Sequence, residues 1–136
     1  MAIKIDYTQK VTVSGELKFS SAQSLQVEAY DQIEAKLPKK EASATAASTV
    51  TVDVQPMGNS GDVVFLVIKA DCYSDNLKFQ VGSGIEIVLN TPYLFAKDAI
   101  KLLDNDKAPQ QVKFTNEDEQ NDVQVTVIVG RKAVVT

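Results

Sequence analysis

The side chains of this sequence that are best suited to chemistry are carboxylates, which gather in short polar segments. They are Asp71 with Asp75, Asp104 with Asp106, and Glu117-Asp118-Glu119 with Asp122. Calcium prefers such oxygen ligands, but no stretch has the Asp-x-Asp-x-Asp-Gly order of a calcium-binding loop. Aspartate is also a standard turn residue, because its side chain bonds to nearby backbone groups. We therefore interpret these clusters as solvated turns and expect no metal site in them.

The other common catalytic groups are missing or isolated. The chain has no histidine, which removes the usual general base and the commonest transition-metal ligand. Its single cysteine, Cys72, permits no intrachain disulfide and no cysteine-cluster zinc site. Gly82-Ser83-Gly84 lacks the downstream lysine of a phosphate-binding loop and instead indicates a hairpin turn. We therefore predict a protein that is not an enzyme and holds no cofactor.

The bulk properties of the chain limit its partners. A length of 136 residues fits one domain over residues 1–136. The net charge of −4 disfavours nucleic acid and anionic membrane surfaces, which both attract basic faces. No apolar run approaches the ~20 residues of a membrane-spanning helix. The first residues lack the apolar middle region of a signal peptide, so we expect cytoplasmic synthesis.

One apolar run organises the expected fold. Residues 63–68 read Val-Val-Phe-Leu-Val-Ile without a polar break. A run this short and this rich in β-branched and aromatic residues predicts a central strand buried on both faces. Alternation of apolar and polar residues predicts further strands at 3–13, 25–29, 33–37, 50–54, 77–81, 85–89 and 123–129. The pattern predicts an all-β antiparallel sandwich, either jelly-roll-like or immunoglobulin-like.

Shorter signals place the turns and the only candidate helix. Ser14-Gly15 predicts a bend after the first strand, and residues 20–23 are polar enough to suggest a loop. Residues 92–103 suit either one short helix or a packed loop, with Thr91 as a possible cap. An apolar-Lys-Phe triplet occurs three times, and we expect its two outer side chains to enter the core. The triplets are Leu17-Lys18-Phe19, Leu77-Lys78-Phe79 and Val112-Lys113-Phe114.

Two strands are candidates for contact with another protein. Both are long and carry few charges, so an open edge on either would invite pairing with a second chain. The candidate interface residues are Ile3, Ile5 and Tyr7 of the first strand and Val123, Val125, Thr126 and Val127 of the last. We expect self-association or docking on a larger protein assembly through one of these strands.

In overall style the chain resembles the small β-sandwich structural proteins of phage and prophage virions. The resemblance rests on the Val50–Val54 alternation, the strand at 63–68 and the ending Val123–Gly130-Arg131. It implies a capsid decoration or accessory protein that acts through protein–protein contacts, as a homo-oligomer located in the virion. The alternative from another class is a recognition module that binds carbohydrate or calcium.

Overall fold

The computed structural model describes residues 3–54, 61–105 and 109–133, and these form ten strands and one short 3-10 helix. One sheet, in the order β3-β10-β5-β8, contains β3 (Ala29–Leu37), β10 (Val123–Ala133), β5 (Gly61–Ala70) and β8 (Tyr93–Ala96). The other, in the order β4-β9-β6-β7, contains β4 (Ser48–Asp53), β9 (Gln111–Asn116), β6 (Leu77–Val81) and β7 (Glu86–Val88). A separate ribbon joins β1 (Ile3–Val13) to β2 (Glu16–Val27), and the helix is η1 (Lys97–Leu102).

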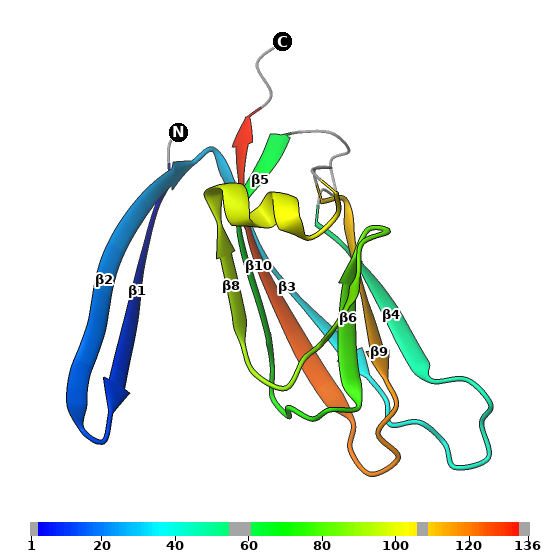
Figure 1. Ribbon diagram of the computed structural model, residues 1–136. Helices are drawn as coiled ribbons and strands as arrows, with labels where there is room; N and C mark the ends of the chain where they lie inside the picture. Colours follow the sequence, from blue (N-terminus) through cyan, green and yellow to red (C-terminus); the bar gives the residue numbers. More distant parts are fainter. Residues whose placement is uncertain (1–2, 55–60, 106–108, 134–136) are drawn as a thin grey trace.

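The pairing of the eight sandwich strands is nested. The strand β3 pairs with β10, β4 with β9, β5 with β8, and β6 with β7, all antiparallel. Two further antiparallel pairs complete the two four-stranded sheets: β10 pairs with β5 in one sheet, and β9 pairs with β6 in the other. This is one long hairpin rolled into two four-stranded sheets, which is the jelly roll. The predicted antiparallel sandwich is confirmed, and of its two proposed forms the jelly roll is the one observed (Figure 1).

The core lies between the two four-stranded sheets. Leu66 and Ile68 of β5 belong to it, together with the alternate valines of β10. From the facing sheet come Phe79 and Phe114, whose ring centroids are 6.5 Å apart. The central position predicted for residues 63–68 is confirmed, because β5 has a neighbour on each edge.

The segment expected to be a short helix or a packed loop contains a strand and a short helix. Tyr93–Ala96 pairs with β5 as the edge strand β8, and η1 follows at once. Lys97 has a φ of 56°, which breaks the extended backbone at the junction. None of the described segments forms a helix of the length and apolarity that crossing a membrane requires.

Candidate protein-binding surface

The β1–β2 ribbon is a long hairpin that stands away from the jelly roll (Figure 1). Its turn is Ser14-Gly15, where both residues have positive φ (52° and 80°), as a tight two-residue hairpin turn demands. Eleven cross-strand pairs run from Ile3 opposite Val27 to Val13 opposite Glu16, with one register shift after Val11. The bend predicted at Ser14-Gly15 is therefore confirmed.

The loop expected at residues 20–23 is absent, because β2 is continuous from Glu16 to Val27. Residues such as Ser20 and Ala22 pair directly with β1. Small polar residues are compatible with a strand here, since this part of the ribbon is exposed on both sides and packs against no core. Within the described residues, β1 and β2 are hydrogen-bonded only to each other, so each keeps an open outer edge.

The base of the hairpin packs on the outer face of the β3-β10-β5-β8 sheet. Tyr7 contacts Phe65, with ring centroids 5.4 Å apart. A Cβ built on Gly130 would stand 2.9 Å from Cδ1 of Ile5 and 3.0 Å from Cγ1 of Val27. Glycine is thus required at this point of β10, because the hairpin lies against its backbone. A second apolar cluster forms there, separate from the main core.

The far end of the hairpin carries apolar side chains that nothing in the described structure covers. We call these four residues the tip. Their exposed fractions are 48% for Val11, 54% for Val13, 55% for Leu17 and 51% for Phe19. Val11 and Phe19 are directly opposite each other, and alternation from Tyr7 puts them on the ribbon face that is turned toward the sheet. Large apolar residues clustered in this way mark binding surfaces in soluble proteins.

The tip also corrects the expectation drawn from the repeated triplets. Leu77 and Phe79 of β6 are buried, as are Val112 and Phe114 of β9. In the first triplet, however, the two outer side chains are the exposed residues Leu17 and Phe19. The same three-residue pattern therefore serves the core twice and an exposed surface once, because only two of the three strands face another sheet.

The sheet face beneath the hairpin explains why the hairpin diverges from it. Close to the hairpin base this face is apolar, with Val67 and Ile128 packed in the second cluster. Farther along it becomes polar, because Thr126 lies between Glu34 of β3 and Lys69 of β5. An apolar hairpin tip gains nothing by packing on such a surface.

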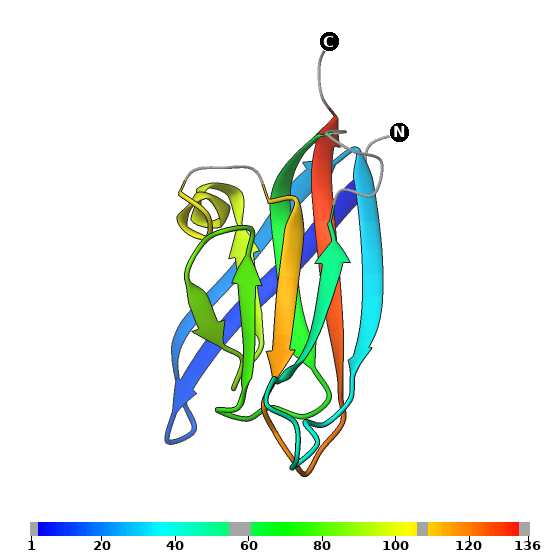
Figure 2. The ribbon, with the colours of Figure 1, turned by 90° about the vertical axis from the view of Figure 1, so that its right-hand side faces the viewer.

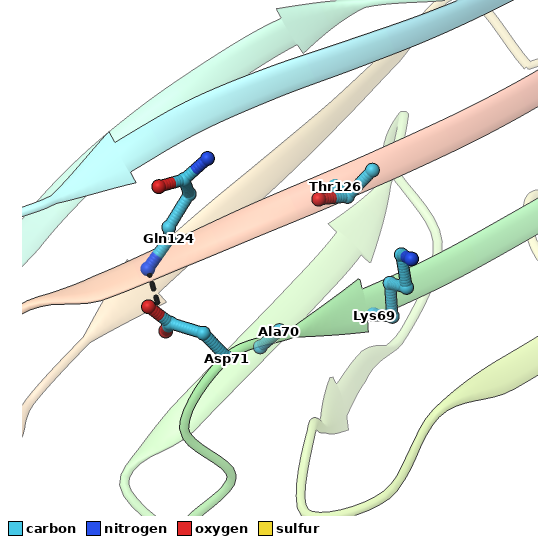
Figure 3. A pocket seen from close by; sticks show the side chains of 5 residues that line it. All are labelled: Lys69, Ala70, Asp71, Gln124 and Thr126. Carbon is cyan, nitrogen blue, oxygen red and sulfur yellow. Dashed lines mark hydrogen bonds between the residues drawn. The ribbon is translucent and has the colours of Figure 1, made fainter.

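An open hollow of about 290 Å³ lies on this polar part of the face. Its lining residues are Lys69, Ala70, Asp71, Gln124 and Thr126 (Figure 3). The backbone N–H of Gln124 donates to Oδ1 of Asp71 at 2.9 Å, and its side-chain amide donates to Glu34 at 3.2 Å. No aromatic ring is among the five lining residues, so the hollow offers no stacking platform for a sugar.

The two strands predicted to form an interface differ in whether they have an open edge. Ile3, Ile5 and Tyr7 lie on β1, which has an open edge, and Ile5 and Tyr7 also anchor the hairpin base. The prediction for the last strand is wrong, because β10 has β3 on one edge and β5 on the other. Its predicted contact residues are buried: Val123 (3% exposed), Val125 (0%), Thr126 (8%) and Val127 (0%).

Two carboxylates of the acidic clusters accept backbone hydrogen bonds, one from a distant segment and one from within its own turn. Asp122 accepts a hydrogen bond from the backbone N–H of Lys39 at 2.8 Å, and Asp118 accepts one from that of Gln120 at 2.7 Å. The second bond, aided by the side chain of Asn121, holds the pKa of Asp118 below its usual value. No group of three metal-ligating side chains occurs in the described part of the chain, and Asp106 lies outside it.

A buried arginine sits near the hairpin base, at the end of β10. Arg131 is 5% exposed, its Nη2 pairs with Asp31, and its Nη1 donates to the carbonyl of Val54 at 2.8 Å. Its Nε has no hydrogen-bond partner in the described structure. We interpret Arg131 as a structural residue, because two of its nitrogens tie β10 to β3 and to the residue after β4.

Comparison with known proteins found no relative of this chain. No family model matches the chain, and neither a curated protein nor a solved structure is significantly similar to it. The candidate surface therefore rests on the residues alone.

Proposed function

We propose that this protein is a non-enzymatic subunit of a larger protein assembly, and that the β1–β2 hairpin is the arm by which it binds a neighbouring subunit. The exposed tip is the observation that carries the proposal. Four large apolar side chains at the end of a projecting ribbon reduce the solubility of an isolated monomer, whereas a neighbouring protein surface would bury them. The open edges of β1 and β2 offer backbone hydrogen-bonding groups to the same partner.

The fold is compatible with this role, and it supports the narrower proposal of a virion decoration or accessory protein only by analogy. Jelly rolls recur in viral capsid domains and also in lectins. A shared fold does not fix a function, so the argument returns to the surface. A projecting arm on a rigid sandwich is the arrangement that an assembly subunit needs, because the sandwich sets the direction in which the arm points.

The test is association of the purified chain, alone and mixed with the products of its neighbouring genes, followed by light scattering behind size exclusion. We expect a complex larger than the monomer. Phe19→Asp should weaken the complex, because it places a charge within the tip. Leu102→Asp is the matched control, since Leu102 is equally apolar, 81% exposed and outside the hairpin. A monomeric wild type that binds none of these products would refute the proposal.

A recognition module that binds carbohydrate or calcium is the second candidate. The observation in its favour is the polar hollow beside Lys69 and Asp71, which has hydrogen-bonding groups and one carboxylate, although it has no aromatic ring for a sugar to stack on. Calcium bound to the native state would raise the melting temperature by mass action, by about 2.7 kcal/mol of stability at a hundredfold excess over its dissociation constant. We expect no change in melting temperature with millimolar calcium or with chelator, and no heat of binding against a glycan panel. A calcium-dependent rise would favour the second candidate.

A further inference from the structure

The two edges of the hairpin differ in how well they are protected against a further strand. The strand β1 carries the charged residues Lys4, Asp6 and Lys10 along its length. The charges of β2 are confined to the end next to the turn, and residues 19–27 include no charged residue and no proline. Natural proteins place charges, proline or a bulge on strand edges that must stay unpaired. The outer edge of β2 therefore has the composition of an edge that accepts another strand.

The backbone of this edge is also available. Within the described residues, β2 is hydrogen-bonded only to β1. The backbone N–H of Glu28, just after β2, donates to the carbonyl of Arg131 in β10 at 2.8 Å and not to β1. Backbone groups alternate between the two sides of a strand, so those of Ala22 and the other even-numbered residues of β2 point to the open edge. Figure 1 and Figure 2 both show the part of β2 near the turn clear of the two four-stranded sheets.

The register shift near the turn limits the part of this edge that can pair. Val11 is opposite Phe19, whereas the next residue of β1 is opposite Leu17. Lys18 is therefore the extra residue of a bulge in β2. The bulge interrupts the ladder and turns Leu17 to the face of the ribbon that is directed away from the sheet. The regular edge of β2 thus begins at Phe19, and Leu17 takes no part in it.

We propose that two copies of the chain pair antiparallel through their β2 edges and form one four-stranded ribbon in the order β1-β2-β2-β1. This inference rests on the proposed function and names the partner as a second copy. The two-fold axis passes beside Ala22, which lies opposite Ala22 of the second copy. About six backbone hydrogen bonds link the copies, two for each pair of even-numbered residues from 20 to 24. The contact is isologous, so it closes after two copies.

The sequence of β2 selects a second copy because it is self-complementary in this register. Apolar residues lie opposite apolar residues, and small or polar residues lie opposite each other. The cross-strand pairs are Phe19 with Leu25, Ser20 with Ser24, Ser21 with Gln23, and Ala22 with itself. An axis on either neighbouring residue spoils this match. An axis on Ser21 sets Phe19 opposite Gln23, and an axis on Gln23 sets Leu25 opposite Ser21.

The antiparallel arrangement also covers part of the exposed tip. It brings the tip of each hairpin beside the base of the other, where the second apolar cluster lies. Phe19, which is 51% exposed, lies beside Leu25 of the second copy, and Leu25 belongs to that cluster. A ribbon of four strands with an apolar face is more stable than a two-stranded one. The second copy therefore pairs the open edge and buries apolar surface in the same contact.

The first experiment measures the dimer dissociation constant by sedimentation of the purified chain over a concentration series. Ala22→Glu should raise this constant about fivefold, because it sets two carboxylates directly opposite each other. Thr8→Glu is the matched control and should leave the constant unchanged, since Thr8 is opposite Ala22 on the same face of the ribbon but lies on β1. Both positions are exposed, and circular dichroism checks that each variant folds.

A mixture of two variants tests the register. Ala22→Lys alone should weaken the dimer as Ala22→Glu does. An equimolar mixture of the two variants should form a heterodimer at least as tight as the wild-type dimer, because a carboxylate then lies opposite an ammonium group.

Disulfide formation locates the same contact. In a Cys72→Ser background, Ala22→Cys should give covalent dimers with oxidised glutathione, because the Cα atoms of a hydrogen-bonded cross-strand pair are about 5.5 Å apart. Thr8→Cys is the control and should give none, because the two copies of residue 8 are three strand spacings apart, about 14 Å.

The outcomes separate the edge pairing from the broader proposal. Phe19→Asp perturbs the arm in any mode of binding, whereas the Ala22 variants perturb only the β2 edge. A dimer that both Ala22 charges weaken, that mixing restores and that Ala22→Cys cross-links supports the pairing. A dimer that these charges leave intact, or that Thr8→Glu weakens equally, overturns the pairing while self-association stands. A monomer that binds another purified protein through its hairpin overturns the pairing but keeps the arm, and a monomer without any partner overturns both.

Discussion

Replacing Phe65 tests whether the outer face of β5 supports the hairpin base. Phe65 is 4% exposed and packs against Tyr7, in the second apolar cluster rather than in the main core. Phe→Ala at a buried site costs about 3–5 kcal/mol, as lost transfer energy plus the cavity that remains. We expect the lower end, about 3 kcal/mol, because Tyr7 is only partly buried and the hairpin base can settle into the space.

The assay is urea unfolding followed by circular dichroism, with the slope checked for two-state behaviour. Phe19→Ala provides a matched control, because it removes the same side chain from the exposed tip. Phe19→Ala should lower the free energy of unfolding of the monomer by less than about 1 kcal/mol, as substitutions at most exposed positions do. If Phe65→Ala cost less than about 1 kcal/mol, or no more than Phe19→Ala, the packing of the hairpin on the sheet would be refuted.

Three further predictions concern other parts of the fold. Gly130→Ala should destabilise the chain by about 1–3 kcal/mol in urea unfolding, because its Cβ would press on Ile5; an unchanged midpoint would contradict the close approach. Arg131→Ala should cost about 1–3 kcal/mol, because it removes a buried side chain and its hydrogen bond to the carbonyl of Val54, while Asp31, whose side chain is 40% exposed, can be solvated; an unchanged urea midpoint would show that these contacts are dispensable. The lowered pKa of Asp118 stabilises the fold above its usual pKa near 4, and this contribution is lost as the pH falls through the folded value. Asp118→Asn should therefore flatten the fall in melting temperature at acid pH, and an unchanged pH profile would count against it.

Local sequence signals predicted where strands and turns occur better than they predicted which strands pair with each other. The Ser14-Gly15 turn and the apolar run 63–68 are both determined by residues close in sequence, and both are found as expected. The alternation over 123–129 is the same for an edge strand and an inner strand. Which of the two it becomes depends on β3 and β5, which are distant in sequence.

The sequence predicted only part of the candidate binding surface, again because burial depends on strands that are distant in sequence. Ile5 and Tyr7 marked the hairpin through their alternation, but the tip residues Leu17 and Phe19 had the pattern of core residues. Whether such a triplet is buried depends on which strand faces another sheet, and no local pattern records that. The one available signal was the stretch of small polar residues around Ser20, which indicated that this strand packs on nothing.

The position of Gly130 in the last strand has a consequence for the order of events during synthesis. The hairpin needs only the first 27 residues, but an isolated two-stranded ribbon is at best marginally stable in water. The sheet surface that holds its base comes from β5 and from β10, which is the last of the described strands in chain order. The nested pairing also makes most sandwich contacts distant in sequence, which slows folding. The hairpin therefore gains its support only once β10 has been made, so under the proposed function unfinished chains would not bind a neighbouring subunit.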